Sequence, residues 1–146
     1  MLESYQGKEG RGALMNALRG QFLVDGNTDI ANMLASATQV KEFTPGTVLF
    51  NEGERGGNLF FIIAGQISVR KREQEIAACN AGMHIGEIGL LEPFTGRSAT
   101  VVAQDTVVAA QISLQKFTEI AELYPNLWRR MALELAHRLV KTQDAV

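Results

Sequence analysis

The chain reads His84-Ile85-Gly86-Glu87-Ile88-Gly89-Leu90-Leu91-Glu92-Pro93-Phe94-Thr95-Gly96-Arg97-Ser98-Ala99-Thr100-Val101 in the region that decides its fold. This segment places glycines, an acid and an arginine between two apolar strand-like runs. Arginine offers two parallel N–H donors that match phosphate oxygens. A tight turn or the first turn of a helix offers backbone N–H groups to an anion, and glycine lets the main chain approach that anion closely. The segment therefore predicts a site for a small anion that also carries a hydroxyl.

The residues of this segment have distinct expected roles. Residues 88–91 can form one helical turn that presents its N-terminus to a phosphate. Pro93 and Gly96 turn the chain so that Arg97 comes back towards that turn. Ser98 can donate its hydroxyl to a phosphate oxygen, and Glu87 can accept a hydrogen bond from a ligand hydroxyl and orient Arg97.

The segment resembles the phosphate-binding cassette of cyclic nucleotide-binding domains, the family of the bacterial catabolite activator and of the regulatory subunit of protein kinase A. Gly86 to Leu90 match the family's Gly-Glu-hydrophobic-small-Leu run, and Arg97 to Val101 match its Arg-(Ser/Thr/Ala)-Ala-Thr/hydrophobic run. The resemblance covers residues 28–142 and implies a regulatory sensor of a 3′,5′-cyclic mononucleotide, with Glu87 on the ribose 2′-hydroxyl. The implied ligand-binding residues are Gly86, Glu87, Ile88, Gly89, Arg97, Ser98 and Thr142.

Two alternatives stand beside that interpretation. The acid and the arginine can form a purely structural pair in a loop, or the fold can persist with a degenerate pocket. Thr142 lies at the position whose hydroxyl contacts the base in the catabolite-activator branch, and it can equally be a solvated residue at a frayed helix end.

Composition bounds the class of protein. The 146 residues fit one domain, with 46% hydrophobic and 21% charged residues. The net charge of −2 gives no basic field for DNA. The single Cys79 fits a reducing cytoplasm. Neither a signal peptide nor an apolar run long enough for a membrane span is evident, so we expect a cytoplasmic protein.

Hydrophobic periodicity predicts helices at the N-terminus. Residues 1–12 are polar and are expected to be mobile, whereas residues 13–24 have apolar positions at helical spacing. A second short helix, capped by Asn27 or Thr28, is expected to end near Ala37.

From Gln39 onwards, short apolar runs alternate with turn signals, which is typical of an antiparallel sandwich or barrel. Gly65 marks a bend or bulge inside the run 59–69, and residues 71–75 indicate an exposed hairpin tip.

The C-terminal third is expected to be helical. Ser113 can cap a first helix, which ends at Tyr124 because Pro125 disfavours helix in the residue before it. A long amphipathic helix follows, with an apolar stripe that either packs on the sandwich or forms the seam of a homodimer. The stripe is Leu127, Met131, Leu135 and Leu139.

The expected fold is therefore mainly β with flanking helices (α+β). It is an antiparallel β-sandwich or jelly roll with N-terminal helices, a short phosphate-binding helix and a long C-terminal helix. We expect an N-terminal helical segment over 1–27 and a cyclic nucleotide-binding domain over 28–146, with the sandwich at about 39–112 and the C-terminal helices at 114–146.

The sequence departs from catabolite-type regulators at its end. Those regulators continue into a helix-turn-helix domain, whereas this chain stops at Val146 without a Gly or Pro stop signal. We therefore favour an effector domain outside the sequence over a stand-alone sensor, with the terminal helix relaying the signal.

Residues 12–27 and 124–130 resemble the sensor half of bacterial antiphage effectors of the Pycsar type, in which a cyclic nucleotide-binding domain precedes a TIR domain that degrades NAD. That resemblance implies cyclic UMP or cyclic CMP as the ligand, a TIR-like effector domain in the full-length protein and no NADase activity of this sequence itself. The alternative is a cyclic AMP-responsive, catabolite-like module.

An enzyme is not expected. The sequence has only two histidines, His84 and His137, and Cys79 is expected to be a buried small hydrophobe, so no usual metal-ligand set assembles. No Ser/His/Asp arrangement with motif spacing is present. We expect His84 to be a strand residue flanking the pocket and His137 to be a helix-surface residue, with no metal and no cofactor beyond the nucleotide ligand. A pure interaction module is the remaining rival.

Overall fold

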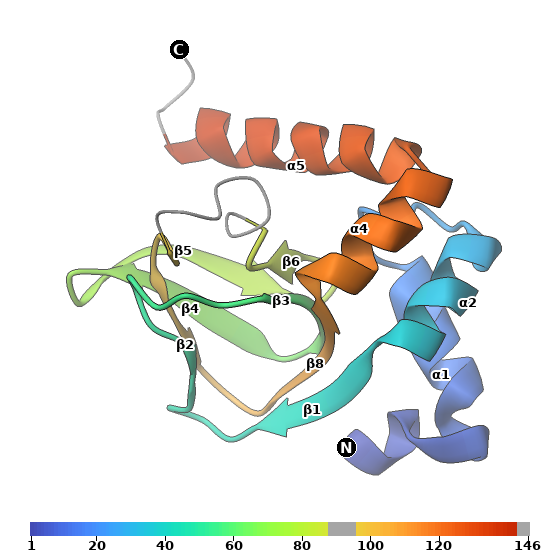
Figure 1. The fold of residues 1–146 in the computed structure, drawn as a ribbon. Helices are drawn as coiled ribbons and strands as arrows, with labels where there is room; N and C mark the ends of the chain where they lie inside the picture. The colour runs from blue at the N-terminus through green and yellow to red at the C-terminus, as the bar shows by residue number, and fades with distance from the viewer. Residues whose placement is uncertain (88–95, 143–146) are drawn as a thin grey trace.

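The structure is a computed structural model that describes residues 1–87 and 96–142. Two four-stranded sheets form a sandwich. Figure 1 shows the helices α1, α2 and α4 on one side of it, with α5 running across the top. All strand pairs are antiparallel. The predicted jelly-roll sandwich with flanking helices is therefore confirmed.

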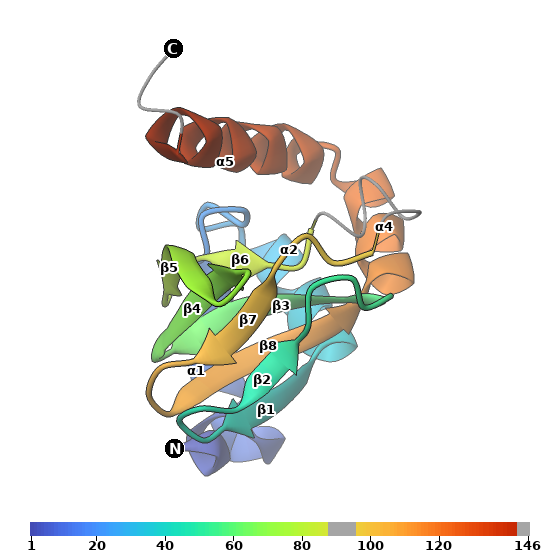
Figure 2. The same ribbon diagram turned by 90° about the vertical axis from the view of Figure 1, so that its left-hand side faces the viewer.

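The first sheet has the strand order β1-β8-β3-β6, and the second has the order β2-β7-β4-β5 (Figure 2). The first sheet consists of β1 (Gln39–Phe43), β8 (Val107–Ser113), β3 (Asn58–Ala64) and β6 (His84–Ile85). The second sheet consists of β2 (Val48–Phe50), β7 (Thr100–Ala103), β4 (Gln66–Lys71) and β5 (Gln74–Asn80).

Strand β3 contains the continuous apolar run 59–63, and both of its faces are buried. Phe60 and Ile62 pack into the core between the two sheets, whereas Leu59, Phe61 and Ile63 pack into a second core beneath the helices. The predicted bend at Gly65 is confirmed: its φ is +86°, and a Cβ atom there would lie 2.3 Å from the Thr106 carbonyl oxygen. Glycine is therefore required where the chain crosses from the first sheet to the second.

The N-terminal helices differ from the prediction. Residues 1–12 are not an unstructured tail: a short 3₁₀ helix, η1 (Leu2–Tyr5), precedes α1 (Gly7–Arg19). Gly10 allows this early start, because a Cβ atom there would lie 2.5 Å from the Tyr5 backbone. The predicted helix over 13–24 therefore begins earlier and ends earlier.

A turn over residues 20–26 ends α1 and fastens the N-terminal segment to the sandwich. The Gln21 side chain donates to the Ile62 carbonyl at 2.9 Å, and the Phe22 N–H donates to the Gly82 carbonyl at 3.1 Å. Asn27 then caps α2 (Thr28–Ala37) by accepting the Ile30 N–H at 3.0 Å, which confirms the predicted helix start.

The predicted C-terminal helices are confirmed. Ser113 caps α4 (Leu114–Leu123) by accepting the Lys116 N–H, and α5 (Asn126–Thr142) follows Pro125. Near its start, α5 is tied to the N-terminal turn, because Arg130 donates to the Phe22 carbonyl at 2.6 Å and lies 3.4 Å from the Asp25 carboxylate. Within the described ranges, no helix combines the length and the apolar character that a membrane span needs.

Candidate functional site

Arg97 is the centre of the site. It lies just before β7 and is 4% exposed. Its Nη1 donates to the Gly86 carbonyl at 3.0 Å, and its Nη2 donates to the Asn58 carbonyl at 2.8 Å. The guanidinium carbon lies 4.1 Å from the centroid of the Phe50 ring, a cation–π contact. The sandwich itself therefore fixes the orientation of this cation.

Two glycines make room for the guanidinium. A Cβ atom at Gly56 would lie 2.5 Å from both Nε and Nη2 of Arg97. Gly86 has a φ of +104°, and a Cβ atom there would lie 3.0 Å from Nη1 and 2.8 Å from the Asn58 carbonyl oxygen. Side chains at either position would displace the arginine, so the backbone of these glycines forms one wall of its slot.

The main chain of Arg97 is equally well fixed. Its N–H donates to the Glu54 carbonyl and its carbonyl accepts the Gly53 N–H, both at 2.8 Å. Gly96 has a φ of +76°, and a Cβ atom there would lie 2.7 Å from the Gly53 carbonyl oxygen. The turn at residues 51–54 thus holds the backbone of Arg97 in place.

The positive charge of Arg97 is only partly balanced by its surroundings. Nε of Arg97 is buried and has no hydrogen-bond partner among the described residues, and no carboxylate in the described ranges lies within ion-pair distance of it. Burial lowers the pKa of Arg97, an effect that the charges of Glu54 and Glu87 oppose. A buried cation without a close counter-ion is unfavourable, so an anionic ligand would complete this slot.

Glu87 is held differently. It is 2% exposed, and its Oε1 forms an ion pair with Nη1 of Arg138 from α5. Arg138 also donates to the His84 carbonyl and to Glu134, at 3.3 Å for the latter. Burial raises the pKa of the Glu87 carboxyl, and the Arg138 charge opposes that rise. The expectation that Glu87 orients Arg97 is corrected here, because two backbone carbonyls orient Arg97 and Glu87 pairs with the terminal helix.

The structure confirms the predicted strand position of His84, the helix-surface position of His137 and the burial of Cys79. His84 is buried in β6, and His137 is exposed on α5 with its ring against Phe22. Cys79 is buried, and burial raises the pKa of its thiol. Among the described residues, no three His, Cys, Asp or Glu side chains are grouped as a metal site would require.

The remaining predicted residues are only partly described. Gly86 lies against Arg97, and Ser98 is an exposed neighbour of that arginine. Ile88, Gly89 and the predicted phosphate-binding turn at residues 88–91 lie outside the described residues. Thr142 is the last residue of α5, and its side chain, which was predicted to contact the base, is not among those that the structure describes.

Sequence reasoning missed four contributors to the site: Phe50, Gly56, Asn58 and Arg138. The pair Gly56-Gly57 before the longest apolar run was visible, but nothing local linked it to an arginine 41 positions later (97 − 56). A buried acid at Glu87 demanded a cationic partner. The sequence could not identify Arg138 among the arginines of α5, because that choice depends on how the helix lies on the sandwich.

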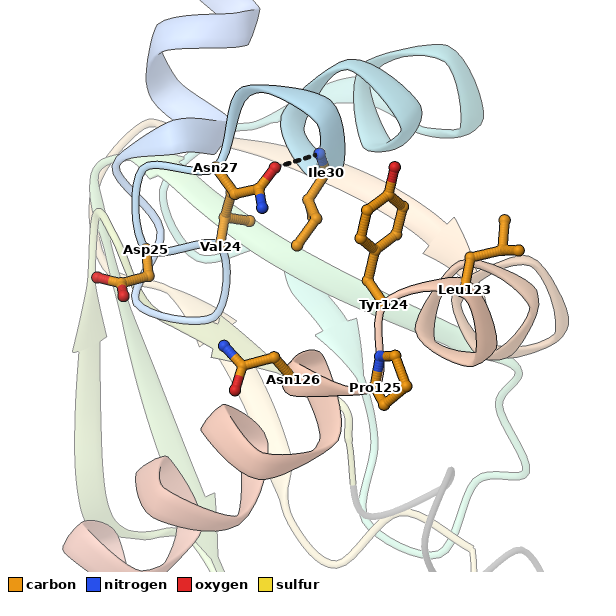
Figure 3. A pocket seen from close by; sticks show the side chains of 8 residues that line it. All are labelled: Val24, Asp25, Asn27, Ile30, Leu123, Tyr124, Pro125 and Asn126. Carbon is orange, nitrogen blue, oxygen red and sulfur yellow. Dashed lines mark hydrogen bonds between the residues drawn. The ribbon is translucent and has the colours of Figure 1, made fainter.

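A separate cavity of about 310 Å³ lies where the N-terminal turn meets the junction of α4 and α5 (Figure 3). Its lining includes neither Arg97 nor Glu87, so it is not the candidate anion site. The lining residues are Val24, Asp25, Asn27, Ile30, Leu123, Tyr124, Pro125 and Asn126.

Comparison with known proteins gives consistent results. The family model described as cyclic nucleotide-binding domain matches residues 40–124. The chain is 34% identical over 146 residues to the Pycsar effector proteins PaPycTIR of Pseudomonas aeruginosa and XpPycTIR of Xanthomonas perforans. These matches cover 100% of the chain but only 47% and 48% of the relatives, so the chain spans about half their length.

A second group of relatives regulates transcription. The cAMP-activated global transcriptional regulator CRP of Salmonella typhimurium is 29% identical over 116 residues, which is 76% of this chain and 55% of CRP.

Solved structures share the fold. The cAMP-bound PfPKA-R superimposes with a TM-score of 0.76 at 21% identity, covering 93% of this chain and 48% of the other. The regulatory domain of Toxoplasma gondii PKA with cAMP gives a TM-score of 0.69 at 26% identity, covering 80% and 46%.

Proposed function

The chain belongs to the family of cyclic nucleotide-binding domains, and we propose that it is a non-catalytic sensor in which Arg97 and the backbone around Gly86 bind the phosphate of a 3′,5′-cyclic mononucleotide. The observation that carries this proposal is the buried guanidinium, which two backbone carbonyls orient and which has an unpartnered Nε. A cyclic phosphate supplies the negative charge and the acceptor oxygens that this cation lacks.

The ribose is proposed to bind at Glu87. A carboxylate accepts a hydrogen bond from the 2′-hydroxyl, and Glu87 is the acid of the cassette on the same strand–turn segment as Gly86. Because Glu87 is also paired with Arg138, a ligand that engages this carboxylate acts directly on α5. The ligand shifts the packing of α5 only by its differential affinity for the two arrangements.

The base and the biological setting are inferred from the relatives. Three Pycsar effectors match the whole chain at 34% identity, whereas CRP matches 76% of it at 29% identity. This favours cyclic UMP or cyclic CMP as the ligand and antiphage defence as the setting, with a TIR-like effector domain in the full-length protein. The proposed output is a change in how α5 presents that domain, and no NADase activity is proposed for this sequence.

A homodimer through α5 is part of the proposal. The predicted stripe is divided in the structure: Leu127 and Met131 are buried in the core beneath the helices, whereas Leu139 is exposed. Leu139 lies with Val140, Ala132 and Ala136 on an exposed stripe at helical spacing. Exposed apolar residues in a continuous stripe favour burial against a second copy. Light scattering of the wild type and of the Leu139→Glu variant tests this: we expect a dimer and a monomer, respectively, and a monomeric wild type would contradict the seam.

Calorimetric titration of the purified chain with cyclic AMP, GMP, CMP and UMP tests the sensor assignment. Selective binding of a pyrimidine nucleotide supports a defence sensor, whereas preference for cyclic AMP supports a catabolite-like module. Failure to bind any of the four would contradict the sensor proposal in favour of a degenerate pocket or an interaction module.

A further inference from the structure

His84 is buried among packed side chains, yet both of its ring nitrogens lack hydrogen-bond partners in the described part of the chain. It is 0% exposed, and its Cα position pairs with that of Phe61 across the first sheet. An apolar side chain would fill this place without removing two nitrogens from water. The polar ring therefore requires an explanation other than packing.

The position of the ring suggests one. Nδ1 of His84 lies 3.5 Å from Oε1 of Glu87, the same oxygen that Arg138 binds. The His84 carbonyl also accepts a hydrogen bond from Arg138. Both the backbone and the side chain of His84 therefore face the pair that links the cassette to α5.

The protonation state decides what His84 can offer. Burial, together with the Arg138 charge, lowers the pKa of His84 to about 3, so the ring is neutral near neutral pH. A neutral imidazole carries one N–H donor and one bare acceptor nitrogen. A carboxylate only accepts hydrogen bonds, so the tautomer compatible with Glu87 carries its proton on Nδ1.

We propose that His84 is a positioning residue for ribose recognition: its Nδ1–H donates a hydrogen bond to the Glu87 carboxylate and holds that carboxylate in place when a ribose 2′-hydroxyl binds it. This inference rests on the proposed function, because it assigns His84 to the acid that reads the ribose. In the structure the nitrogen is close to Glu87 but does not form the bond. A small shift of Glu87 towards His84 would complete it.

Side-chain geometry provides a sharp test. The amide nitrogen of asparagine can take the place of Nδ1, whereas the longer glutamine places its amide nearer the position of Nε2. We therefore compare His84→Asn with His84→Gln and with the apolar His84→Phe. The readout is the ratio of affinities, by calorimetry, for the tightest-binding ribonucleotide of the four cyclic nucleotides and for its 2′-deoxy form.

We expect His84→Phe and His84→Gln to reduce the ribo/deoxy ratio about tenfold and His84→Asn to retain it, as for the loss of one hydrogen bond to a charged group. His137→Gln, which changes the exposed histidine of α5, is the control and should leave the ratio unchanged. A wild-type protein that binds ribo and 2′-deoxy ligands equally would overturn the ribose role of Glu87 and this inference with it. Normal discrimination in all His84 variants would overturn only the role of His84.

If a His84 variant does not fold, a measurement on the wild-type chain still tests the proposal. Nitrogen-15 NMR of histidine-labelled protein separates the two neutral tautomers. We expect the His84 proton on Nδ1 both with and without nucleotide, and a proton on Nε2 would overturn the proposal.

Discussion

Arg97 and Glu87 are both buried charged residues of one cassette, but different parts of the molecule hold them. The sandwich holds Arg97 through the carbonyls of Gly86 and Asn58 and the ring of Phe50. The terminal helix holds Glu87 through Arg138, 51 positions away in the sequence. The arginine is thus preorganised by the fold, and the acid is coupled to a helix that lies outside the sandwich (Figure 1).

This difference assigns separate tasks to the two halves of the site. A cation whose orientation the sandwich already fixes favours affinity, because less conformational freedom is lost when the anion binds. An acid shared between ligand and helix provides communication, because the ligand must change the energy of the helix contact in order to bind. Perturbing Arg97 and its slot should therefore weaken the binding of every cyclic nucleotide, and perturbing Glu87 should alter selectivity and coupling.

The largest expected effect comes from Arg97→Ala. Removing the cation should weaken cyclic nucleotide binding by about 2–5 kcal/mol, because the phosphate loses its buried charged partner. That corresponds to a roughly thirty-fold to several-thousand-fold rise in Kd by calorimetry. Arg129→Ala, which removes an exposed arginine of α5, is the matched control. Unchanged affinity of Arg97→Ala would remove the anion slot from the mechanism.

Gly56→Ala should break the same half of the site without removing its charge. The new Cβ atom would lie 2.5 Å from the guanidinium and force it out of its slot. We expect binding to weaken by about 1–3 kcal/mol, which is the typical energetic cost of overpacking a well-packed site. Gly57→Ala is the control, since a Cβ atom there meets no heavy atom within 4 Å. Equal affinities of the two variants would show that the slot is not tight.

Glu87→Gln should have a smaller effect and a different character. The amide can still accept one hydrogen bond from the ribose but loses the charge, so we expect about tenfold weaker binding of the ribonucleotide. The affinity for the 2′-deoxy ligand should change less, so the ratio of the ribo affinity to the 2′-deoxy affinity should decrease. Should wild-type protein fail to distinguish the two ligands in the same titrations, the ribose role of Glu87 is wrong.

The last expected effect is on stability and not on binding, and it comes from the buried neutral His84. Its pKa of about 3 in the folded state lies below the ordinary value of 6.5, so between these values the unfolded chain binds a proton that the folded chain does not. Stability should therefore fall as the pH falls below 6.5, by about 2 kcal/mol between about pH 7 and pH 5. The raised pKa of Glu87 acts in the opposite direction, because there the folded state holds the extra proton.

Comparison of variants isolates the histidine contribution. Urea unfolding of wild type and His84→Phe across this pH range should give a flatter pH profile for the variant, and His137→Gln should follow the wild type. Parallel profiles for wild type and His84→Phe would contradict this, because they would indicate that the pKa of His84 is the same in the folded and unfolded chains.

Much of the fold could be predicted from local patterns. Turn residues and alternating apolar runs placed the strands, and Ser113 and Asn27 marked true helix starts because an N-cap satisfies backbone donors within the first turn. The start of α1 was missed because Gly10, normally unfavourable in a helix, packs there against the backbone of Tyr5. That contact depends on a neighbouring turn and not on helix propensity.

The sequence by itself determined an antiparallel sandwich or barrel with flanking helices, because that class depends on short-range periodicity and turn residues. The motifs of the cassette, with its acid and its arginine, carried the resemblance to the family. Only the tertiary structure decided how the two charges are held: a glycine slot built from the turn before β3 for Arg97, and an arginine from α5 for Glu87. The physical reason is that a buried charge selects its partner from whatever the packed fold brings within a few ångströms, and that choice is not encoded in local spacing.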